Sequence, residues 1–523
     1  MRWLKDRWPQ ACAILSGALL SASFAPLETS EAAWIALIPL LLACRFADER
    51  HSVFRLGFLA GSVFWLTSIW WLVHVSWAGW ITLAFYCALY VGAFAWFAAR
   101  WFRKFGHLNW AGNLAGMFLM ACAWAGLEWV RGTFATGFPW NPLGVSLYRN
   151  PALLQAAAWG GAYAVSALVV WVNAGIAFTA ARYIERGGHW GRRPHVELML
   201  AFLVLALAFW GGVRRVRAME PGPSELRVGL VQTAIPQDDK WDSNTVDLIY
   251  RRLDELTTGV KRTGPLHLII WPETALPDDV RYSQASYDLV YKLCELGTPI
   301  LVGSMDSEWP EKEPPRYFNS SFLFDIDGKV IGSYEKQHLV PFGEYIPLQK
   351  ILPFIKAMTP IQESFTAGTN AAIFSLDEPA VDFSVLICFE DTIPRLARNA
   401  VRAGARLLVN QTNDAWFDPS SASRQHRAHC VLRVVETGVP AVRAANTGVS
   451  CYINRRGVIA AELVDGRGNT IFPGFKSIGV WPAPAQLTHT FYVRYGDVLP
   501  MGAAGIALLA ALGMRIRAGQ PTP

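Results

Sequence analysis

The sequence predicts an α/β protein in two parts: an eight-span α-helical membrane domain and a polar α/β domain inserted before the last span. Hydrophobic residues make up 52% of the 523 residues and charged residues only 17%, whereas soluble domains carry about a quarter charged residues. After residue 220, a long polar stretch alternates β-branched runs with mixed-charge runs, which is typical of layered α/β packing. The net charge of +6 is dispersed, which argues against the basic stripe of a nucleic-acid-binding protein.

Residues 1–218 are expected to hold seven transmembrane helices, and residues 493–515 an eighth. Crossing ~30 Å of hydrocarbon takes roughly 20 apolar residues. Apolar segments run at about 10–27, 55–76, 79–99, 110–130, 153–181, 195–213 and 494–514, with a shorter one at 31–44. Basic clusters near 2–7, 45–55, 100–104, 182–193 and 515–517 lie at alternate ends. The positive-inside rule therefore predicts eight crossings with both termini in the cytoplasm.

Two features of this part leave alternatives open. The basic residues at 214–217 follow the seventh span on the face predicted to be external, which is tolerated because a long translocated domain follows. The first span could instead be a cleaved signal peptide. Glu128 and Arg131 lie three residues apart near the outer end of one span. They form either an interfacial ion pair or a polar floor for a lipid headgroup.

Residues 225–487 are expected to form the α/β domain. Apolar runs predict strands at 226–232, 267–271, 299–305, 319–325, 382–388 and 405–411, and helices are expected at 244–260, 283–295 and 393–403. Alternating strands and helices predict sheets that are covered by helices. The eight cysteines are widely spaced and form no CxxC pair. Neither a disulfide framework nor a zinc site is predicted, and no metal or other cofactor is expected.

Three motifs near predicted strand ends carry the candidate chemistry. Glu273 follows the run LIIWP, where a carboxylate can act as a general base. Lys336 and Glu344 belong to the loop YEKQHLVPFGEYIP, and Cys388 ends the run SVLIC, with Glu390 two residues later. A cysteine on a strand-to-helix turn can project its sulfur into a cleft, and a nearby ammonium group is expected to lower its pKa.

Each of these residues alone has a simpler explanation. Cys388 could be a small buried hydrophobe, Lys336 a solvated loop residue, and Glu273 a helix N-terminal residue favoured by the helix dipole. Taken together, in the order Glu, Lys, Cys, the three motifs favour catalysis.

The motifs WPET, the EK of YEKQHLVPFGEYIP, and the CFE of SVLICFED resemble the catalytic triad of the nitrilase superfamily. Over nearly its full length the chain resembles the apolipoprotein N-acyltransferases, the membrane-bound branch of that superfamily. Further segments that carry the resemblance are FAP (24–26), EWVRGTFATGFPW (128–140), VGLVQTAIPQDDKW (228–241), NQTNDAWF (410–417), RAANTGVS (443–450) and YVRYGD (492–497). The sequence departs at Phe389, where the family commonly has Tyr. A phenol hydrogen bond is lost there, while the packing of the ring can survive.

The resemblance implies a nitrilase-like α-β-β-α sandwich on the periplasmic side of the bacterial inner membrane. It implies that Cys388 is the nucleophile, that Glu273 is the general base and later the acid, and that Lys336 faces the oxyanion. Glu344 would orient Lys336 or assist proton transfer, and Glu390 would support the site. Candidates for an acyl-chain wall, each of which fits core packing at least as well, are Trp241, Phe342, Phe389 and Trp416.

The implied reaction moves a fatty acyl group from a glycerophospholipid, through a Cys thioester with ping-pong kinetics, to an apolipoprotein. The acceptor is the α-amino group of the N-terminal diacylglyceryl-cysteine, and the reaction is the last step of lipoprotein maturation. The expected partners are these two lipids and the membrane, without nucleic acid, and a monomer is expected. The alternatives are a membrane-tethered nitrilase or amidase that hydrolyses a small C–N substrate, and a non-catalytic lipoprotein-binding or structural membrane protein. Loops 306–318 and 353–368 are long enough for lids but fit ordinary surface loops equally.

Overall fold

The computed structural model describes residues 2–48, 51–105, 110–189, 195–219, 222, 225–311, 313–347 and 364–516. The chain divides into two compact units, Met1–Ala218 with Thr490–Pro523, and Met219–His489. Parts of the sequence predictions lie outside the described residues: several basic positions, among them Arg192 and Arg193, and residues 353–363 of the second candidate lid.

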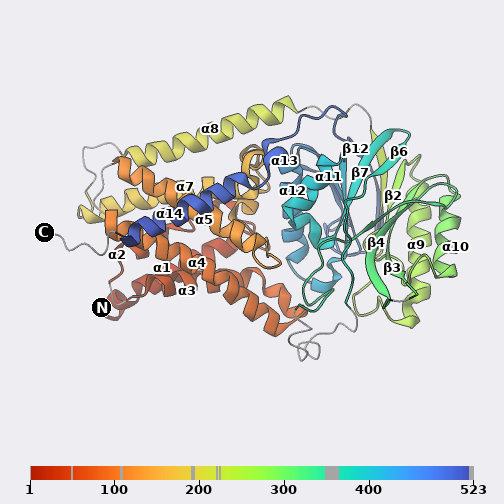
Figure 1. The fold of residues 1–523 in the computed structure, drawn as a ribbon, viewed down its shortest axis with the longest axis horizontal. Coiled ribbons are helices and arrows are strands. Elements are labelled where there is room, and N and C mark those ends of the chain that lie inside the picture. Colours follow the sequence, from red (N-terminus) through yellow and green to blue (C-terminus); the bar gives the residue numbers. More distant parts are fainter. Residues whose placement is uncertain are drawn as a thin grey trace. The chain divides into compact units, whose positions relative to one another are not determined.

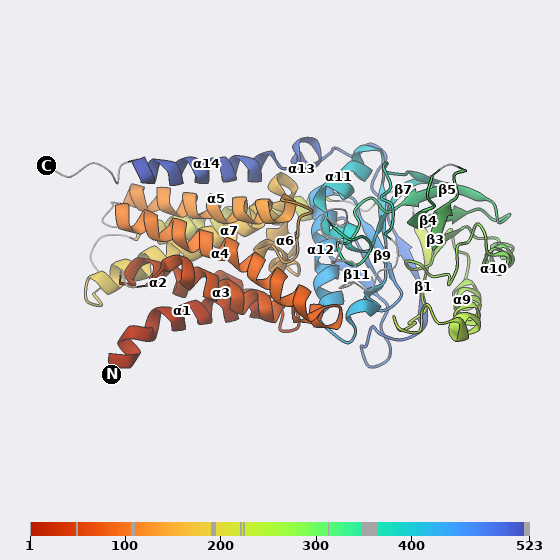
Figure 2. The same cartoon turned by 60° about the horizontal axis from the view of Figure 1, so that its bottom comes forward.

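The first unit is helical, and its long helices lie alongside one another (Figure 2). Its α-helices are α1 (Arg2–Ala22), α2 (Ile38–Phe46), α3 (Val53–Ser68), α4 (Trp77–Phe105), α5 (Trp110–Thr133), α6 (Pro151–Leu154), α7 (Ala157–Glu185), α8 (Val196–Ala218), α13 (Phe491–Tyr495) and α14 (Val498–Ile516). Short 3-10 helices are η1 (Ser30–Trp34), η2 (Trp70–His74) and η3 (Leu143–Leu147). Among the described residues, four helices are long and apolar enough to cross a membrane: α4, α5, α7 and α8.

The predicted segment 31–44 is broken. It consists of η1 and the nine-residue helix α2, which begins with Pro39 in its first turn. Proline lacks an N–H group and fits best in the first turn of a helix, where that group has no intrahelical partner, so Pro39 suits the point at which α2 begins. Small residues determine the close packing of α3 on α4, because a Cβ atom at Gly57 or Gly61 would lie within 3 Å of backbone atoms of α4.

The second unit contains two six-stranded sheets, ordered β12-β1-β2-β3-β4-β5 and β11-β10-β9-β8-β7-β6. The strands are β1 (Leu226–Gln232), β2 (Leu268–Ile270), β3 (Ile300–Glu308), β4 (Arg316–Phe324), β5 (Val330–Glu335), β6 (Phe374–Asp377), β7 (Ala380–Ile387), β8 (Leu407–Thr412), β9 (Ala441–Ala445), β10 (Cys451–Ile453), β11 (Ile459–Glu462) and β12 (Gly474–Val480). The sheets lie between α9 (Val246–Lys261) with α10 (Gln284–Cys294) and α11 (Pro394–Arg402) with α12 (Ala422–Thr437) (Figure 1). The α-β-β-α sandwich is confirmed.

The layers follow from which faces of the strands are apolar. Leu230 of β1 and Val385 of β7 belong to one buried cluster between the two sheets, whereas Val231 packs in a second cluster with helix α9. Helix α9 buries Ile249 and Leu253, one turn apart, against that outer face. Strands β7, β8 and β9 run parallel, so their carboxyl ends meet at one edge of the sheet.

The first candidate lid, residues 306–318, is largely strand. β3 and β4 both extend past their predicted ends and pair as far as Glu308 and Arg316. Most of this segment is therefore a hairpin whose backbone is held by ladder hydrogen bonds.

Candidate active site

Glu273 lies in the turn after β2, close to the buried side chain of Trp271. Trp271 is fully buried, and its indole N–H donates to Thr257 Oγ1 at 3.0 Å. Glu273 is only 6% exposed, and its Oε1 accepts a hydrogen bond from Asn319 Nδ2 at 2.8 Å. Its Oε2 atom has no hydrogen-bond partner among the described residues. This oxygen is available to accept a proton from a reacting group.

Lys336 follows β5 and joins two carboxylates. Its Nζ lies 2.6 Å from Glu344 Oε1 and 3.4 Å from Glu273 Oε1, and the side chain is buried. Glu344 Oε2 accepts from the Val340 N–H at 2.8 Å, which fixes this carboxylate in its loop. Burial alone lowers the pKa of Lys336, but Glu344, Glu273 and Cys388 together raise it well above its ordinary value. Lys336 is therefore an ammonium group over the whole physiological range.

Cys388 stands at the turn between β7 and the short 3-10 helix η6 (Cys388–Thr392). Its φ of 52° is in the left-handed region, which is uncommon for a residue with a side chain. The Cys388 carbonyl accepts hydrogen bonds from Asn410 Nδ2 at 3.1 Å and His426 Nε2 at 3.2 Å. Such a conformation persists where the surroundings hold it from several sides.

The expected lowering of the Cys388 pKa was wrong. Burial raises the pKa of this thiol most, Glu273 and Asp414 raise it further, and the opposing effect of Lys336 is smaller. The net pKa lies well above the ordinary value, so the resting sulfur is a neutral thiol. A nucleophile in this state needs a base at the moment of attack.

Glu390 ties the Cys388 turn to the loop that follows Lys336. Its Oε1 accepts from the N–H groups of Gln337 (2.7 Å) and His338 (2.9 Å). Its Oε2 accepts from the Ile387 N–H and from Tyr334 Oη, both at 2.8 Å. With both oxygens engaged and the residue fully buried, Glu390 holds the site's main chain.

The four aromatic candidates are not gathered into one buried wall. The ring of Phe389 stacks on that of His338, with centroids 6.0 Å apart, so the packing role expected for this ring is present. Trp241, Phe342 and Trp416 are 52%, 49% and 41% exposed. Trp241 and Phe342 lie in turns and Trp416 lies in the short 3-10 helix Asp414–Phe417, and all three expose apolar surface.

Four buried charged side chains lie close to Cys388, and the sequence analysis gave none of them a role: Asp391, Asp414, His426 and Arg443. Arg443 contacts Asp391 Oδ2 at 2.6 Å and Asp414 Oδ2 at 3.0 Å. His426 Nδ1 lies 2.9 Å from Asp414 Oδ1 and 2.8 Å from Arg443 Nη2, and its Nε2 lies 2.8 Å from Asp391 Oδ1.

This buried network favours the protonated form of His426. Nε2 faces the Cys388 carbonyl and the Asp391 carboxylate, which both accept, so Nε2 donates, whereas Nδ1 lies between the Asp414 carboxylate and the Arg443 guanidinium. Burial and Arg443 lower the pKa of His426, but Asp391 and Asp414 raise it to about 9. A signal was present in the sequence, since Arg443 interrupts an apolar strand, where a charge is rarely buried without partners.

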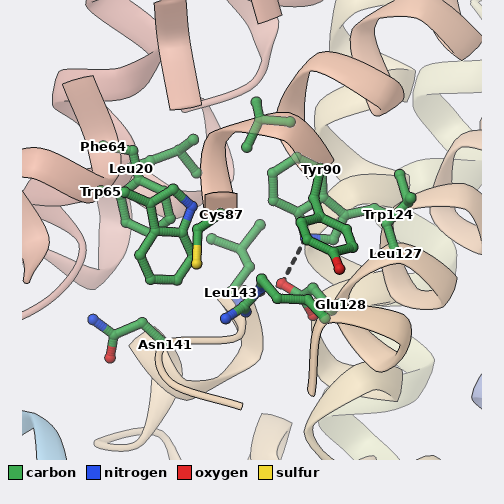
Figure 3. Close-up of a pocket in the computed structure, with 12 residues that line it drawn as sticks. Leu20, Phe64, Trp65, Cys87, Tyr90, Trp124, Leu127, Glu128, Asn141 and Leu143 are labelled. Atoms are coloured by element: carbon green, nitrogen blue, oxygen red, sulfur yellow. Dashed lines mark hydrogen bonds between the residues drawn. The ribbon is translucent and has the colours of Figure 1, made fainter. Parts of the chain in front are cut away.

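A separate cavity lies within the helical unit, lined by Trp65, Cys87, Tyr90, Trp124, Glu128 and Arg131 among others (Figure 3). Glu128 Oε1 accepts from Trp124 Nε1 and from the Leu143 N–H, both at 2.7 Å. Arg131 Nη1 donates to the carbonyls of Phe138 (2.6 Å) and Trp140 (2.8 Å). The structure records no salt bridge between Glu128 and Arg131 among the residues it describes, so the interfacial ion pair is not formed.

The comparisons with known proteins cover both units. A family model for the N-terminal domain of apolipoprotein N-acyltransferase matches residues 16–175, and a carbon-nitrogen hydrolase model matches residues 227–473. An apolipoprotein N-acyltransferase of Geobacter metallireducens is 38% identical over 96% of this chain and 95% of its own length. One of Gloeobacter violaceus is 31% identical over 97% and 94%. Among solved structures, an amidase from Nesterenkonia sp. aligns with a TM-score of 0.36 and 19% identity over 52% of this chain and 95% of its own.

Proposed function

We propose, from the premise that this chain belongs to the apolipoprotein N-acyltransferase family, that Cys388, Glu273 and Lys336 carry out its acyl transfer. Membership makes the chain an N-acyltransferase of lipoprotein biosynthesis, with a lipid acyl donor and a lipoprotein acceptor. One observation supports this assignment of residues: Lys336 Nζ contacts both Glu273 and Glu344. Cys388, which acts on the pKa of this lysine, is held in a left-handed turn. A purely structural lysine would not need two buried carboxylates beside a thiol.

In the first half-reaction, the donor is a glycerophospholipid. Glu273 Oε2 takes the thiol proton while the Cys388 sulfur bonds to the ester carbonyl carbon, and the oxyanion faces the Lys336 ammonium. Collapse breaks the C–O bond, and Glu273 returns the proton to the glycerol oxygen. A lysophospholipid leaves, and a thioester remains on Cys388.

In the second half-reaction, the α-amino group of the diacylglyceryl-cysteine on the apolipoprotein attacks the thioester carbon. Glu273 accepts a proton from the attacking nitrogen, the C–N bond forms, and the C–S bond breaks. The proton then passes from Glu273 to the departing sulfur, which restores the resting thiol. Because the first product leaves before the acceptor reacts, ping-pong kinetics are expected.

The membrane arrangement that fits this reaction has eight crossings, with residues 1–218 and 493–515 in the bilayer and the catalytic domain (225–487) in the periplasm. Four long apolar helices support it. Arg45 in the last turn of α2 pairs with Glu185 at the end of α7, so two basic helix ends meet at one face. Arg149 and Glu28, which belong to loops predicted to be external, also pair with each other.

A labelling experiment tests this orientation. Lys329→Cys places a thiol in an exposed turn of the catalytic domain, and Arg186→Cys places one at the end of α7. In cells with a permeabilised outer membrane, an impermeant maleimide should label the first variant and spare the second. The reverse pattern would place the catalytic domain in the cytoplasm and exclude the arrangement.

The reaction class is tested by intact mass spectrometry of the full-length protein after exposure to phospholipid in mixed micelles. A mass gain of one acyl chain that maps to Cys388 is expected. The matched control is Cys294→Ala, a buried cysteine of helix α10, which should acylate normally. Acylation that persists in Cys388→Ala would exclude this nucleophile. Release of a free acid from small amides, without lipid, would favour the tethered amidase instead.

A further inference from the structure

A second buried lysine, Lys240, lies beside the site and has no part in the mechanism above. It belongs to the loop after β1 and is 4% exposed. Its Nζ donates to the main-chain carbonyl of Glu273 at 3.1 Å. Among the described residues its ammonium group forms no salt bridge. A buried ammonium without a paired carboxylate is costly, which points to a use for the charge.

The loop that carries Lys240 is held in place by a chain of amide side chains. Asn446 Oδ1 accepts from the Ile235 N–H at 3.0 Å, and Asn446 Nδ2 donates to Asn413 Oδ1 at 2.8 Å. Asn413 Nδ2 donates in turn to Gln237 Oε1 at 2.8 Å. Two loops that are distant in sequence, those of Asn413 and Asn446, therefore fix the backbone on which Lys240 stands.

Lys240 adds a positive charge to a site that is rich in carboxylates. Glu273 and Glu344 contribute two negative charges, Lys336 contributes one positive charge between them, and Glu390 is a third buried carboxylate close by. Without Lys240, negative charge would move onto the sulfur in a site where only Lys336 opposes these carboxylates. With Lys240, the group of Glu273, Glu344, Lys336 and Lys240 holds two negative and two positive charges, and the transfer of the Cys388 proton to Glu273 leaves that sum unchanged.

The electrostatics of the groups agree with this count. Burial lowers the pKa of Lys240 to about 8, and it is held from falling further by Glu273 and Cys388. The ammonium form therefore predominates at neutral pH, where its charge faces Glu273 and, once it forms, the Cys388 thiolate. Of the charges that face Cys388, Glu273 and Asp414 raise its pKa and Lys336 lowers it, so a second cation acts in the direction that catalysis needs.

We propose that Lys240 is a positioning residue for the acyl transfer: its buried ammonium holds the main chain of Glu273 and offsets the second carboxylate while negative charge develops on Cys388. This inference rests on the proposed function of the same site.

The test compares Lys240→Gln, which removes the charge, with Lys240→Arg, which keeps it, in the full-length protein in detergent. Lys292→Gln on helix α10 is the matched control, since this exposed lysine pairs with Asp254 at the surface. The measurement is the rate at which iodoacetamide alkylates Cys388, followed on its peptide by mass spectrometry between about pH 6.5 and 9.5. Acyl-enzyme formation from phospholipid is measured in parallel.

In Lys240→Gln, the alkylation rate should fall about tenfold below pH 8, which corresponds to a rise of about one unit in the pKa of Cys388. The deficit should shrink above about pH 8, because Lys240 of the wild type then loses its own proton. Acyl-enzyme formation should slow by a similar factor. Lys240→Arg should keep the alkylation rate of the wild type at neutral pH, and the control should match the wild type throughout.

An unchanged alkylation profile in folded Lys240→Gln would overturn the inference. Equal slowing in Lys240→Gln and Lys240→Arg would also overturn it, because the effect would then come from side-chain packing and not from charge. If Lys240→Gln does not fold, Lys240→Arg decides, because a slowed alkylation in that charge-preserving variant contradicts the electrostatic role. A wild type that alkylates but never acylates refutes the proposed function. Acylation that is normal in both wild type and Lys240→Gln refutes only the role of Lys240.

Discussion

Replacing Glu273 by glutamine should change two reactions of Cys388 in opposite directions. The carboxylate has one oxygen bound by Asn319 and Lys336 and one without a partner among the described residues. A glutamine side chain is close in shape, so it can keep the first set of contacts while losing the proton acceptor. At the same time, the variant removes a negative charge that raises the Cys388 pKa. Acylation by phospholipid should slow, whereas alkylation by a small electrophile should become faster.

The magnitudes follow from the two roles. A positioned general base contributes about 10²–10⁴-fold to a rate, which corresponds to about 3–5.5 kcal/mol of activation free energy. Alkylation depends on the thiolate fraction, which rises tenfold for each pH unit by which the Cys388 pKa falls. Removing the adjacent carboxylate should lower that pKa by about one unit or more. The ratio of the two rates should therefore change by at least about a thousandfold.

Both rates can be measured on one preparation in mixed micelles, with acyl-enzyme formation followed by intact mass and alkylation by peptide mass. Glu255→Gln, an exposed acid of helix α9, is the control and should leave both rates unchanged. If both rates fall together in the Glu273 variant, the substitution has disturbed the geometry of the site. If acylation is unchanged, Glu273 is not the base.

Three further predictions concern the residues that hold the site. His426→Gln should destabilise the protein most below about pH 6.5. The pKa of His426 is raised to about 9 in the folded protein, so protonation of this ring stabilises the fold by about 3 kcal/mol. That stabilisation is complete below the unfolded pKa of about 6.5 and is lost as the pH rises through about 9. Equal losses in unfolding midpoint at pH 6 and pH 9.5 would contradict this. Tyr334→Phe removes a donor to Glu390 and should cost about 1.5–3 kcal/mol, seen as a lower unfolding midpoint with the pH profile of acylation unchanged. Arg443→Met leaves two buried carboxylates without their guanidinium and should cost about 3–5 kcal/mol; a smaller loss than in Tyr334→Phe would refute the ranking.

Local patterns in the chain predicted many of the elements. The runs at 226–232 and 382–388 correspond to β1 and β7, and the amphipathic stretch near 244–260 corresponds to α9. Short strands such as β6 and β10 were not predicted, because three or four residues carry too little periodicity to separate a strand from a loop. Helix α12 was also missed. It is buried on all sides, and its many polar residues are spread around the helix, so no separate apolar stripe marks it.

The candidate site was predictable as a set of residues but not as an electrostatic environment. Glu273, Lys336 and Cys388 are recognisable from the short motifs around them, and the structure brings the first two within 3.4 Å. The partners of His426 and the position of Lys240 were not predictable, because they depend on contacts between loops that are far apart in the chain. Arg443 and Asp391 are 52 positions apart in sequence and 2.6 Å apart in space.

By itself, the sequence determined the properties that each segment carries with it: apolar stretches long enough for a bilayer, strands with apolar faces, and the order of a carboxylate, an amine and a thiol. Tertiary structure alone decided the protonation state of that thiol. A nearby ammonium suggested a thiolate, but burial, Glu273 and Asp414 together outweigh Lys336 and keep the resting sulfur neutral. A pKa is a sum over every charge and every displaced water around a group, and only the fold brings those contributions together.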